Sequence, residues 1–310
     1  MRFDVGYGMY DAINFDGGPG SGNHGHSGRK GMRGGSAPSG KRDYGSFEVA
    51  AAKDGTLKPT VTLSKDVDSN GGLTPKRQEL HKRIIDMLID GTPKAKGQAV
   101  MTFLGGGPAS GKSSITRDPD SGVMKSNEAV CIDSDSIKQM IPEYQKMLAN
   151  GDDTAADCVH KESSMIAWKA LSIAQNEGYH CVMDGTGDGT AESMRESINE
   201  AKAKGMYVKG VYASCATEEA VRRAYARATN SDNPEDKGRK VPEKLIRKTH
   251  KNVSKCVPDI ADDYDELTIY DTNTKTAKKI AHKDYGKSLV IDDKKLYSDF
   301  LEKANEIVEE

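Results

Sequence analysis

An apolar run at residues 99–104, AVMTFL, leads directly into a glycine-rich segment at residues 105–114, GGGPASGKSS, and this junction constrains the fold more than any other feature of the chain. Residues 106–113 fit the pattern G-x-x-x-x-G-K-[ST], and the residues that follow have the character of a helix. Glycines let a backbone wrap closely around a phosphate and point its N–H groups inward, and a helix N-terminus adds partial positive charge. The sequence therefore predicts a strand, a phosphate-binding loop and a helix in direct succession.

The loop predicts a nucleoside triphosphate as ligand, ATP or GTP, together with Mg²⁺. We expect Lys112 to bridge the β- and γ-phosphates and the hydroxyl of Ser113 to hold the metal ion, as the corresponding residues of P-loops do. The residues expected to contact the nucleotide are Gly106, Gly107, Pro108, Ala109, Ser110, Gly111, Lys112, Ser113 and Ser114.

From residue 98 onward, short apolar runs alternate with amphipathic segments. The predicted strands are 99–104, 129–133, 179–183, 207–213 and 267–270, and the predicted helices are 112–118, 136–149, 155–177, 190–204, 217–229, 243–256 and about 293–308. Strands that alternate with helices favour a mainly parallel sheet with helices on both faces. The sequence thus predicts an α/β fold of the P-loop type.

Composition divides the chain into three regions. Residues 1–45 hold a Gly/Ser-rich tract with too little apolar surface to offset the entropy of ordering, so we expect a flexible, disordered tail. This tract resembles Gly-rich segments of bacteriophage structural and head-assembly polypeptides, which implies a phage origin. Residues 46–96 are expected to form a linker and an N-terminal helix between Thr74 and Gly91, which packs on a P-loop domain at residues 97–310.

The charge balance indicates no partner, because 45 Lys and Arg face 47 Asp and Glu, a net charge of −2. Five widely spaced cysteines, none in a C-x-x-C pair, indicate reduced thiols and not a zinc site. No apolar stretch approaches the roughly 20 residues of a membrane span, and a secretory signal is not recognisable. We therefore expect no membrane partner and a cytoplasmic location, which is the host-cell cytoplasm if the protein is phage-encoded.

Two acids, Asp133 and Asp135, come at the end of the strand predicted at residues 129–133. Open α/β sheets bind ligands at the carboxyl ends of their strands. While the chain stays extended, residues two apart share a face, so one acid can organise Mg²⁺ and the other can accept a proton from an attacking hydroxyl. We expect Asp133 at the metal and the substrate. The alternative is that Asp135 or Ser134 only caps the next helix.

The strand predicted at residues 179–183 ends in the acid- and hydroxyl-containing turn DGTGDGT. Because this turn should lie beside the P-loop, Asp184 and Thr186 are candidates for contacts to the substrate or the metal. The alternative is a tight turn that only leads into the next helix, with Asp188 and Thr190 as its capping residues.

A basic arm at residues 222–251 contains ten Lys or Arg against four acids. Arg223 and Arg227 are four apart and share a helix face, and a breaker-rich loop follows at residues 230–238. Arginines on a helix and a mobile loop can close over a γ-phosphate. The competing interpretations are a solvated basic face and a nucleic-acid surface. Tyr225 is the one aromatic residue among these basic residues, and single-stranded nucleic acid is usually bound by several stacked rings, so nucleic acid is not expected as a partner.

The region from about residue 74 to residue 271 resembles the zeta toxin family of P-loop kinases. The matching segments, in the family's order, are TPKRQELHKRII, GGGPASGKSS, IDSDSIKQMIPEY, VMDGTGDGT, GRKVPEKLIRKTH and IYDTN. The resemblance implies a P-loop kinase fold and an enzyme that phosphorylates a small molecule, UDP-N-acetylglucosamine, at its 3′-hydroxyl; related folds phosphorylate an antibiotic hydroxyl. It also implies an antitoxin protein as a partner.

Residue roles carry over by position within these segments. Lys112 resembles the phosphate lysine and Asp135 resembles the general base. The arginines on the transferring phosphate correspond to Arg227, with a register uncertain by one residue, and Arg239, while Asp184 and Thr186 align with the element that holds the sugar. Well-known toxins carry a glutamate followed by Leu-Arg where this chain has Asp184 and Gly187-Asp188, a difference that bears on the acceptor and leaves the nucleotide site unchanged.

Three functions are therefore in view. The first is a small-molecule kinase of the zeta type, and the second is a polynucleotide 5′-kinase whose basic arm holds a strand. The third is a non-catalytic nucleotide-binding module of a phage structural polypeptide. Asp135 and Arg239 weigh against the third, because a binding module needs neither a base nor a γ-phosphate arginine. We interpret His250 as a surface or packed residue and Trp168 as a core residue.

Overall fold

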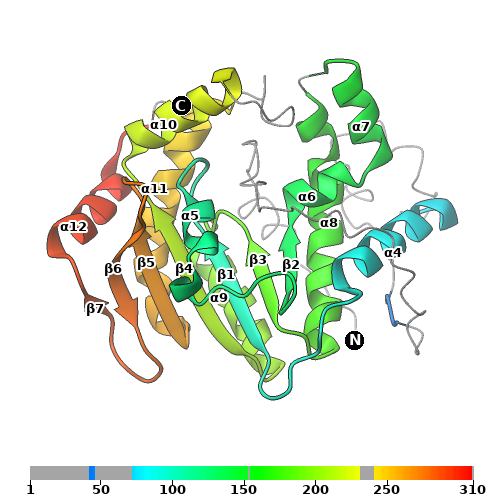
Figure 1. The fold of residues 1–310 in the computed structure, drawn as a ribbon, viewed down its shortest axis with the longest axis horizontal. Coiled ribbons are helices and arrows are strands. Elements are labelled where there is room, and N and C mark those ends of the chain that lie inside the picture. The colour runs from blue at the N-terminus through cyan, green and yellow to red at the C-terminus, as the bar shows by residue number, and fades with distance from the viewer. Residues whose placement is uncertain (1–41, 46–71, 153, 231–240, 309–310) are drawn as a thin grey trace.

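The computed structural model describes residues 42–45, 72–152, 154–230 and 241–308, and a seven-stranded sheet runs through its centre (Figure 1). The strands are β1 (Val100–Gly105), β2 (Val130–Asp133), β3 (Cys181–Asp184), β4 (Tyr207–Ser214), β5 (Glu266–Asp271), β6 (Lys278–Lys283) and β7 (Val290–Ile291), in the order β2-β3-β1-β4-β5-β6-β7. Nearly all of the predicted tail and the first part of the predicted linker lie outside the described residues. The domain boundaries stay predictions.

The first five strands are parallel, as the alternation of strands and helices predicted. β1 lies between β3 and β4, with β2 added beyond β3 and β5 beyond β4. A strand covered on both faces is apolar along its whole length, and five of the six residues of β1 are buried. In Figure 1, α9 (Ala191–Ala203) and α11 (Glu243–Ile260) pass behind the sheet and α5 (Lys112–Arg117) stands in front of it. The predicted α/β fold with a mainly parallel sheet is confirmed.

The hairpin at the edge of the sheet was not expected from the sequence. β6 pairs antiparallel with β5, and the two-residue β7 pairs antiparallel with β6. In β6, KKIAHK, the first two lysines are exposed and Ile280 and Ala281 are buried. Charged residues are typical of edge strands, where they discourage pairing with another chain. Because of these charges, β6 contains no apolar run from which a strand could be predicted.

The remaining helices cover the sheet and its ends (Figure 1). They are α4 (Pro75–Ile89), α6 (Ser134–Gln139), α7 (Pro142–Ala149), α8 (Ala155–Asn176), α10 (Thr217–Asn230) and α12 (Lys294–Glu302). The helix predicted at residues 136–149 is wrong in one respect, because it is two helices. Pro142 disfavours a helical backbone at Ile141, which is extended with φ −88° and ψ 117°, so α7 begins anew at the proline.

The N-terminal helix α4 is held to α8 by buried charges. Thr74 caps α4 by accepting from the backbone N–H of Arg77. The guanidinium of Arg77 donates to both oxygens of Glu162 on α8, at 2.6 and 2.7 Å, and to Glu143 on α7 at 3.0 and 3.1 Å. His81 lies 2.8 Å from the same Glu162 carboxylate. Glu162 is fully buried, so α4, α7 and α8 meet at one ion cluster.

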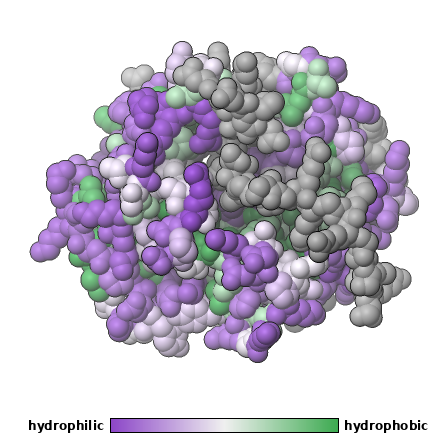
Figure 2. All heavy atoms as spheres, in the orientation of Figure 1, coloured by the Kyte–Doolittle hydropathy of each residue, from purple (hydrophilic) through white to green (hydrophobic). Residues whose placement is uncertain are grey.

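The face seen in Figure 2 is mostly hydrophilic among the coloured residues, and its hydrophobic side chains lie in small separate groups. No helix in the described part of the chain has both the length and the apolar character of a membrane span. The cytoplasmic location stays a prediction.

Candidate active site

The sheet topology brings the P-loop and the predicted acids to one edge. β3 pairs with β1 and with β2, so Asp184 stands beside Leu104 on one side and beside Asp133 on the other. The P-loop begins directly after β1, two residues beyond Leu104. Residues that are far apart in the sequence, on three separate strands, therefore meet at the carboxyl ends of neighbouring parallel strands, as the sequence predicted.

The P-loop has a backbone that only its residue types allow. Gly106 has φ 135°, a conformation that side-chain-bearing residues rarely adopt, and a Cβ there would lie 2.6 Å from the carbonyl oxygen of Ala213. Ala109 has φ 58°, also in the left-handed region, and packs against the cluster of Cys215, Ala220, Ala224 and Ile246. The N–H of Gly106 donates to the carbonyl of Thr186 at 2.7 Å, which ties the loop to the turn after β3.

Two side chains support the loop from behind, and sequence reasoning assigned neither a role. His250 on α11 is buried and donates from Nε2 to the carbonyl of Pro108 at 3.0 Å. Burial and nearby cations lower the pKa of His250 to about 3, so its ring is neutral. The hydroxyl of Thr272 lies within hydrogen-bonding distance of the carbonyls of Ser110 and Ser214. Thr272 belongs to the segment IYDTN and His250 ends the segment GRKVPEKLIRKTH, so membership of these family-like segments was a usable signal for both residues.

Lys112 turns toward the carboxylates. Its side chain is buried, and Nζ donates to the carbonyl of Gly185 at 2.7 Å and lies 3.1 Å from Oδ1 of Asp184. The predicted phosphate lysine and the first residue of the predicted acid-Gly-Thr element are thus an ion pair at the centre of the site.

Asp133 and Asp135 have different surroundings. The chain does not stay extended between them as we expected, because Ser134 already begins α6. Asp133 caps this helix by accepting from the N–H groups of Asp135 and Ser136, so the cap is neither of the two residues proposed from the sequence. Burial and the charges of Asp135 and Asp184 raise the pKa of Asp133 to about 6.

Asp135 lies one residue into α6 and is buried with Lys138. Nζ of Lys138 donates to Oδ1 of Asp135 at 2.7 Å, and both side chains are at least 93% inaccessible to solvent. His160 on α8 is close to both, and burial together with the charge of Lys138 lowers the pKa of His160 to about 4. Asp135 is therefore a buried carboxylate whose charge a lysine compensates.

The turn after β3 holds a second buried acid. The hydroxyl of Thr186 donates to Oδ1 of Asp188, and burial raises the pKa of Asp188 to about 6. Asp188 is thus not the helix cap that the sequence suggested as an alternative. Thr190 caps α9 as that alternative predicted, by accepting from the N–H of Ser193.

Arg223 on α10 lies beside the end of the P-loop. Its Nε donates to Glu219 at 2.7 Å, and Nη2 donates to the carbonyls of Thr272 at 2.7 Å and Asn273 at 3.1 Å. A Cβ placed on Gly111 would lie 3.3 Å from Nη1 of Arg223. Sequence reasoning noted Arg223 but assigned the phosphate role to Arg227, in the last turn of the same helix.

Arg239, the other arginine of the predicted site, lies outside the described residues. The hydroxyl of Ser113 and the carboxylate of Asp133 are oxygen donors of the kind that Mg²⁺ prefers. No cluster of three or more His, Cys, Asp or Glu side chains with metal-binding geometry occurs among the described residues. Mg²⁺ in phosphoryl-transfer sites is usually held by one or two carboxylates, the phosphates and water, so this donor set fits the ion.

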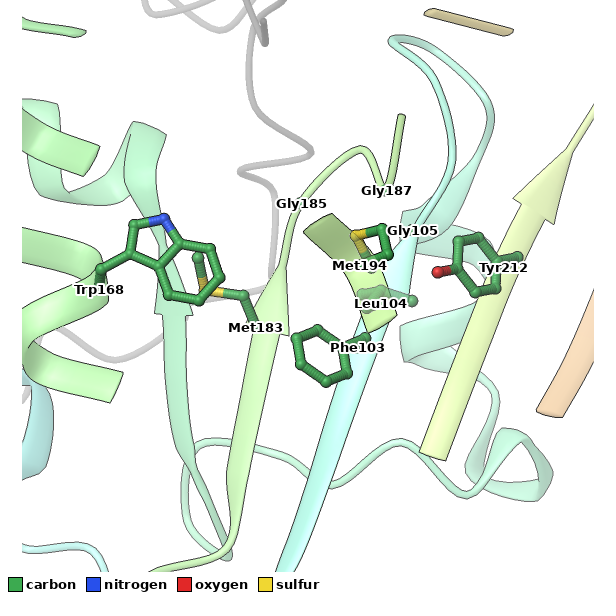
Figure 3. A pocket seen from close by; sticks show the side chains of 9 residues that line it. All are labelled: Phe103, Leu104, Gly105, Trp168, Met183, Gly185, Gly187, Met194 and Tyr212. Carbon is green, nitrogen blue, oxygen red and sulfur yellow. The ribbon is translucent and has the colours of Figure 1, made fainter. Parts of the chain in front are cut away.

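A small apolar pocket lies under the turn that follows β3 (Figure 3). Its walls include Trp168 from α8, Met183 from β3, Met194 from α9 and Phe103 from β1, and the backbone of Gly185 closes it at the turn. The space amounts to about 20 Å³, which is near the size of one water molecule or one methyl group. Trp168 was interpreted as a core residue; it is partly buried and also lines this pocket.

Comparison with known proteins places these residues in a family. The sequence model of the zeta toxin family matches residues 85–282. The solved structure of AvrRxo1-ORF1:-ORF2 with ATP is 17% identical with a TM-score of 0.60, over 77% of this chain and 76% of that chain. The native AvrRxo1-ORF1:-ORF2 complex is 17% identical with a TM-score of 0.59, over 83% and 79%. These likenesses show the fold.

A structure of the PezAT chromosomal toxin–antitoxin system of Streptococcus pneumoniae is 18% identical with a TM-score of 0.49, over 65% of this chain and 78% of that chain. None of the curated proteins compared with this chain matches it.

Proposed function

The chain belongs to the zeta toxin family, and we propose that it is an ATP-dependent kinase that transfers the γ-phosphate to a hydroxyl group of a small molecule. One observation carries the proposal: a P-loop lysine and the buried acids Asp135 and Asp184 converge at one edge of the sheet. A P-loop by itself occurs in many nucleotide-binding proteins. A buried carboxylate beside it supplies the group that phosphoryl transfer to a hydroxyl requires, an acceptor for the hydroxyl proton.

The nucleotide would lie in the loop formed by residues 106–113, with its terminal phosphates at Lys112. In the structure, the ammonium group of Lys112 contacts Asp184 and the carbonyl of Gly185. A phosphate provides a stronger anionic partner, so the lysine is placed to change partners when ATP binds. Ser113 and Asp133 would hold Mg²⁺, which supplies charge neutralisation at the phosphates when bound. The fold relative crystallised with ATP supports ATP as the nucleotide.

Asp135 would accept the proton of the acceptor hydroxyl as its oxygen attacks the γ-phosphorus and the bond to the β-phosphate breaks. Lys138 compensates the negative charge of this carboxylate and fixes its position through Oδ1. Arg227 and Arg239 are proposed as the arginines that stabilise the transferring phosphate, and Arg223 is a further candidate because it lies against the end of the P-loop.

The acceptor is proposed to be a nucleotide sugar such as UDP-N-acetylglucosamine, held by Asp184 and Thr186. An antitoxin protein is the proposed partner, on the basis of the family. A polynucleotide acceptor receives no support from the described part of the basic arm. Arg222 is paired with Glu219, and Arg247 is paired with Glu218 and Glu243, so these cations are already compensated.

The direct test is transfer of label from γ-labelled ATP to UDP-N-acetylglucosamine. We expect Asp135→Asn to lose at least 100-fold in the rate of transfer while it still binds ATP, because general base catalysis contributes about 10²–10⁴-fold. Asp120→Asn is the matched control, since Asp120 is exposed and lies outside the site. Equal rates in wild type and Asp135→Asn would show that Asp135 is not the base.

A further inference from the structure

The apolar pocket under the turn after β3 borders the place where the reaction would occur (Figure 3). Gly185 lines the pocket, and its carbonyl oxygen accepts a hydrogen bond of 2.7 Å from Nζ of Lys112. Met183 and Gly187, which also line the pocket, flank the substrate-binding residues Asp184 and Thr186 in the sequence. The pocket and the polar groups of the site are therefore two sides of the same five-residue segment, which comprises the end of β3 and the start of the turn.

Any acceptor must reach this turn. A phosphate bound at Lys112 lies within a few ångströms of Gly185, and the attacking oxygen of an acceptor must come within about 3–3.5 Å of the phosphorus. Because Gly185 both lines the pocket and accepts the hydrogen bond from Lys112, a sugar-sized acceptor positioned in this way lies next to the turn. The pocket is thus within reach of groups that lie a few bonds from the reacting hydroxyl.

The lining of the pocket determines which groups fit. Carbon and sulfur atoms of Phe103, Trp168, Met183 and Met194 form its walls, and Tyr212 contributes its ring while its hydroxyl pairs with Tyr264 at 2.8 Å. A hydroxyl or charged group in this space would lose hydrogen bonds to water without replacement. A methyl group would gain from leaving water.

Building on the kinase function proposed above, we infer that this pocket is an acceptor subsite that takes a compact apolar group, of methyl or ethyl size, located a few bonds from the hydroxyl that is phosphorylated. The space of about 20 Å³ sets the size. Two of its walls are methionines, whose unbranched side chains adjust to irregular shapes, so an ethyl group is accommodated as well as a methyl group. The subsite selects acceptors by an apolar substituent, while Asp184 and Thr186 contact polar groups.

The test compares two acceptors in wild type and in a variant with a filled pocket. UDP-N-acetylglucosamine and UDP-N-formylglucosamine differ only by a methyl group on the amide. We expect wild type to prefer the first in kcat/KM by at least about tenfold, since one methylene in an apolar pocket is worth roughly 10–200-fold. Met194→Phe places a larger side chain in the pocket and should remove most of this preference. Met194→Leu, which nearly conserves volume, should retain it.

Met87→Phe is the control for the substitution itself, because Met87 is 68% exposed on α4, far in sequence from the turn. Melting temperature and ATP affinity report whether Met194→Phe is folded. An unchanged preference in a folded Met194→Phe variant would overturn the inference, and so would equal use of both acceptors by wild type.

A direct probe separates this inference from the kinase proposal. If neither nucleotide sugar is phosphorylated, the proposed acceptor is wrong, and the pocket is tested with xenon by following the methyl resonances of Met183 and Met194. A dry apolar cavity binds xenon, so we expect both resonances to shift in wild type and the shift of the Met183 resonance to be lost in Met194→Phe. Absence of xenon binding in wild type would show that the space is filled or polar, and would refute the subsite.

Discussion

Replacing Arg77 with methionine would leave the carboxylate of Glu162 buried without its guanidinium partner. Glu162 is inaccessible to solvent and receives hydrogen bonds of 2.6 and 2.7 Å from Arg77, with His81 2.8 Å away. Removing one partner of a buried ion pair typically costs 3–5 kcal/mol, because the remaining charge is uncompensated. Since a domain is stable by only about 5–15 kcal/mol, this would be a large fraction of the total.

The pKa of Glu162 gives a similar value for the stabilisation by this ion pair. Burial by itself would raise the pKa of Glu162, but hydrogen bonds and charges from His81 and Arg77 outweigh it and lower the pKa from 4.5 to about 2. At about 1.4 kcal/mol per pKa unit, this corresponds to roughly 3 kcal/mol of stability at neutral pH. Because the folded pKa is lowered, the stabilisation is complete above pH 4.5 and is lost as the pH falls toward 2.

The free energy of unfolding is measured by urea unfolding, followed by the fluorescence of Trp168, which is the single tryptophan of the chain and lies on α8. We expect Arg77→Met to lower the free energy of unfolding by about 3–5 kcal/mol at pH 7 and by less at pH 3.5. Arg83→Met is the matched control, because Arg83 is exposed on the same helix and should change stability by less than about 0.5 kcal/mol.

A double variant in which Arg77 and Glu162 are both methionine should recover much of the loss, since apolar residues can replace a buried ion pair. Equal stability of the Arg77→Met and Arg83→Met variants at pH 7 would refute the reasoning.

Three further perturbations address the site. Asp188→Asn should raise the free energy of unfolding by up to about 2–3 kcal/mol at pH 7.5 and leave it unchanged below pH 4. The reason is that the pKa of Asp188 in the folded protein is about 6, so its ionisation destabilises the fold as the pH rises from 4 to 6. Thermal melting at both pH values checks this. Arg223→Ala should weaken ATP binding about tenfold or more by calorimetry, because it leaves two carbonyls beside the P-loop unpaired, whereas Arg222→Ala should not. Gly107→Ala should lower the melting temperature and ATP affinity, since its Cβ would lie 2.3 Å from the imidazole on α11, whereas Gly97→Ala, with nothing within 4 Å, should be neutral.

Much of the fold was predictable because its signals are local. Each of the five parallel strands contains a short, largely apolar stretch, and the P-loop follows β1 with its lysine and glycines at fixed spacing. The split between α6 and α7 also has a local signal, Pro142, which the prediction of a single helix at residues 136–149 did not take into account. β6 has no such local signal, because a strand that begins with exposed lysines has no apolar run to detect.

The candidate site was predictable in its membership but not in its contacts. Sequence spacing selected Lys112, Asp135 and Asp184, and the parallel sheet indeed brings them to one edge. No local pattern distinguishes Asp133, which caps α6, from Asp135, which pairs with Lys138, because the difference arises where the strand turns into the helix. The positions of Arg223 and His250 against the P-loop depend on the packing of α10 and α11.

The sequence by itself determined the P-loop and the alternation of strands and helices, since both depend on short stretches of chain: glycine positions, apolar runs and helix caps. Tertiary structure alone decided that β1 lies between β3 and β4, and with it which carboxylate contacts the lysine and that an apolar pocket lies under the turn at Gly185. The physical reason is that contacts between the parallel strands join residues 51 to 107 positions apart, and their partners are set by strand order, which no local propensity encodes.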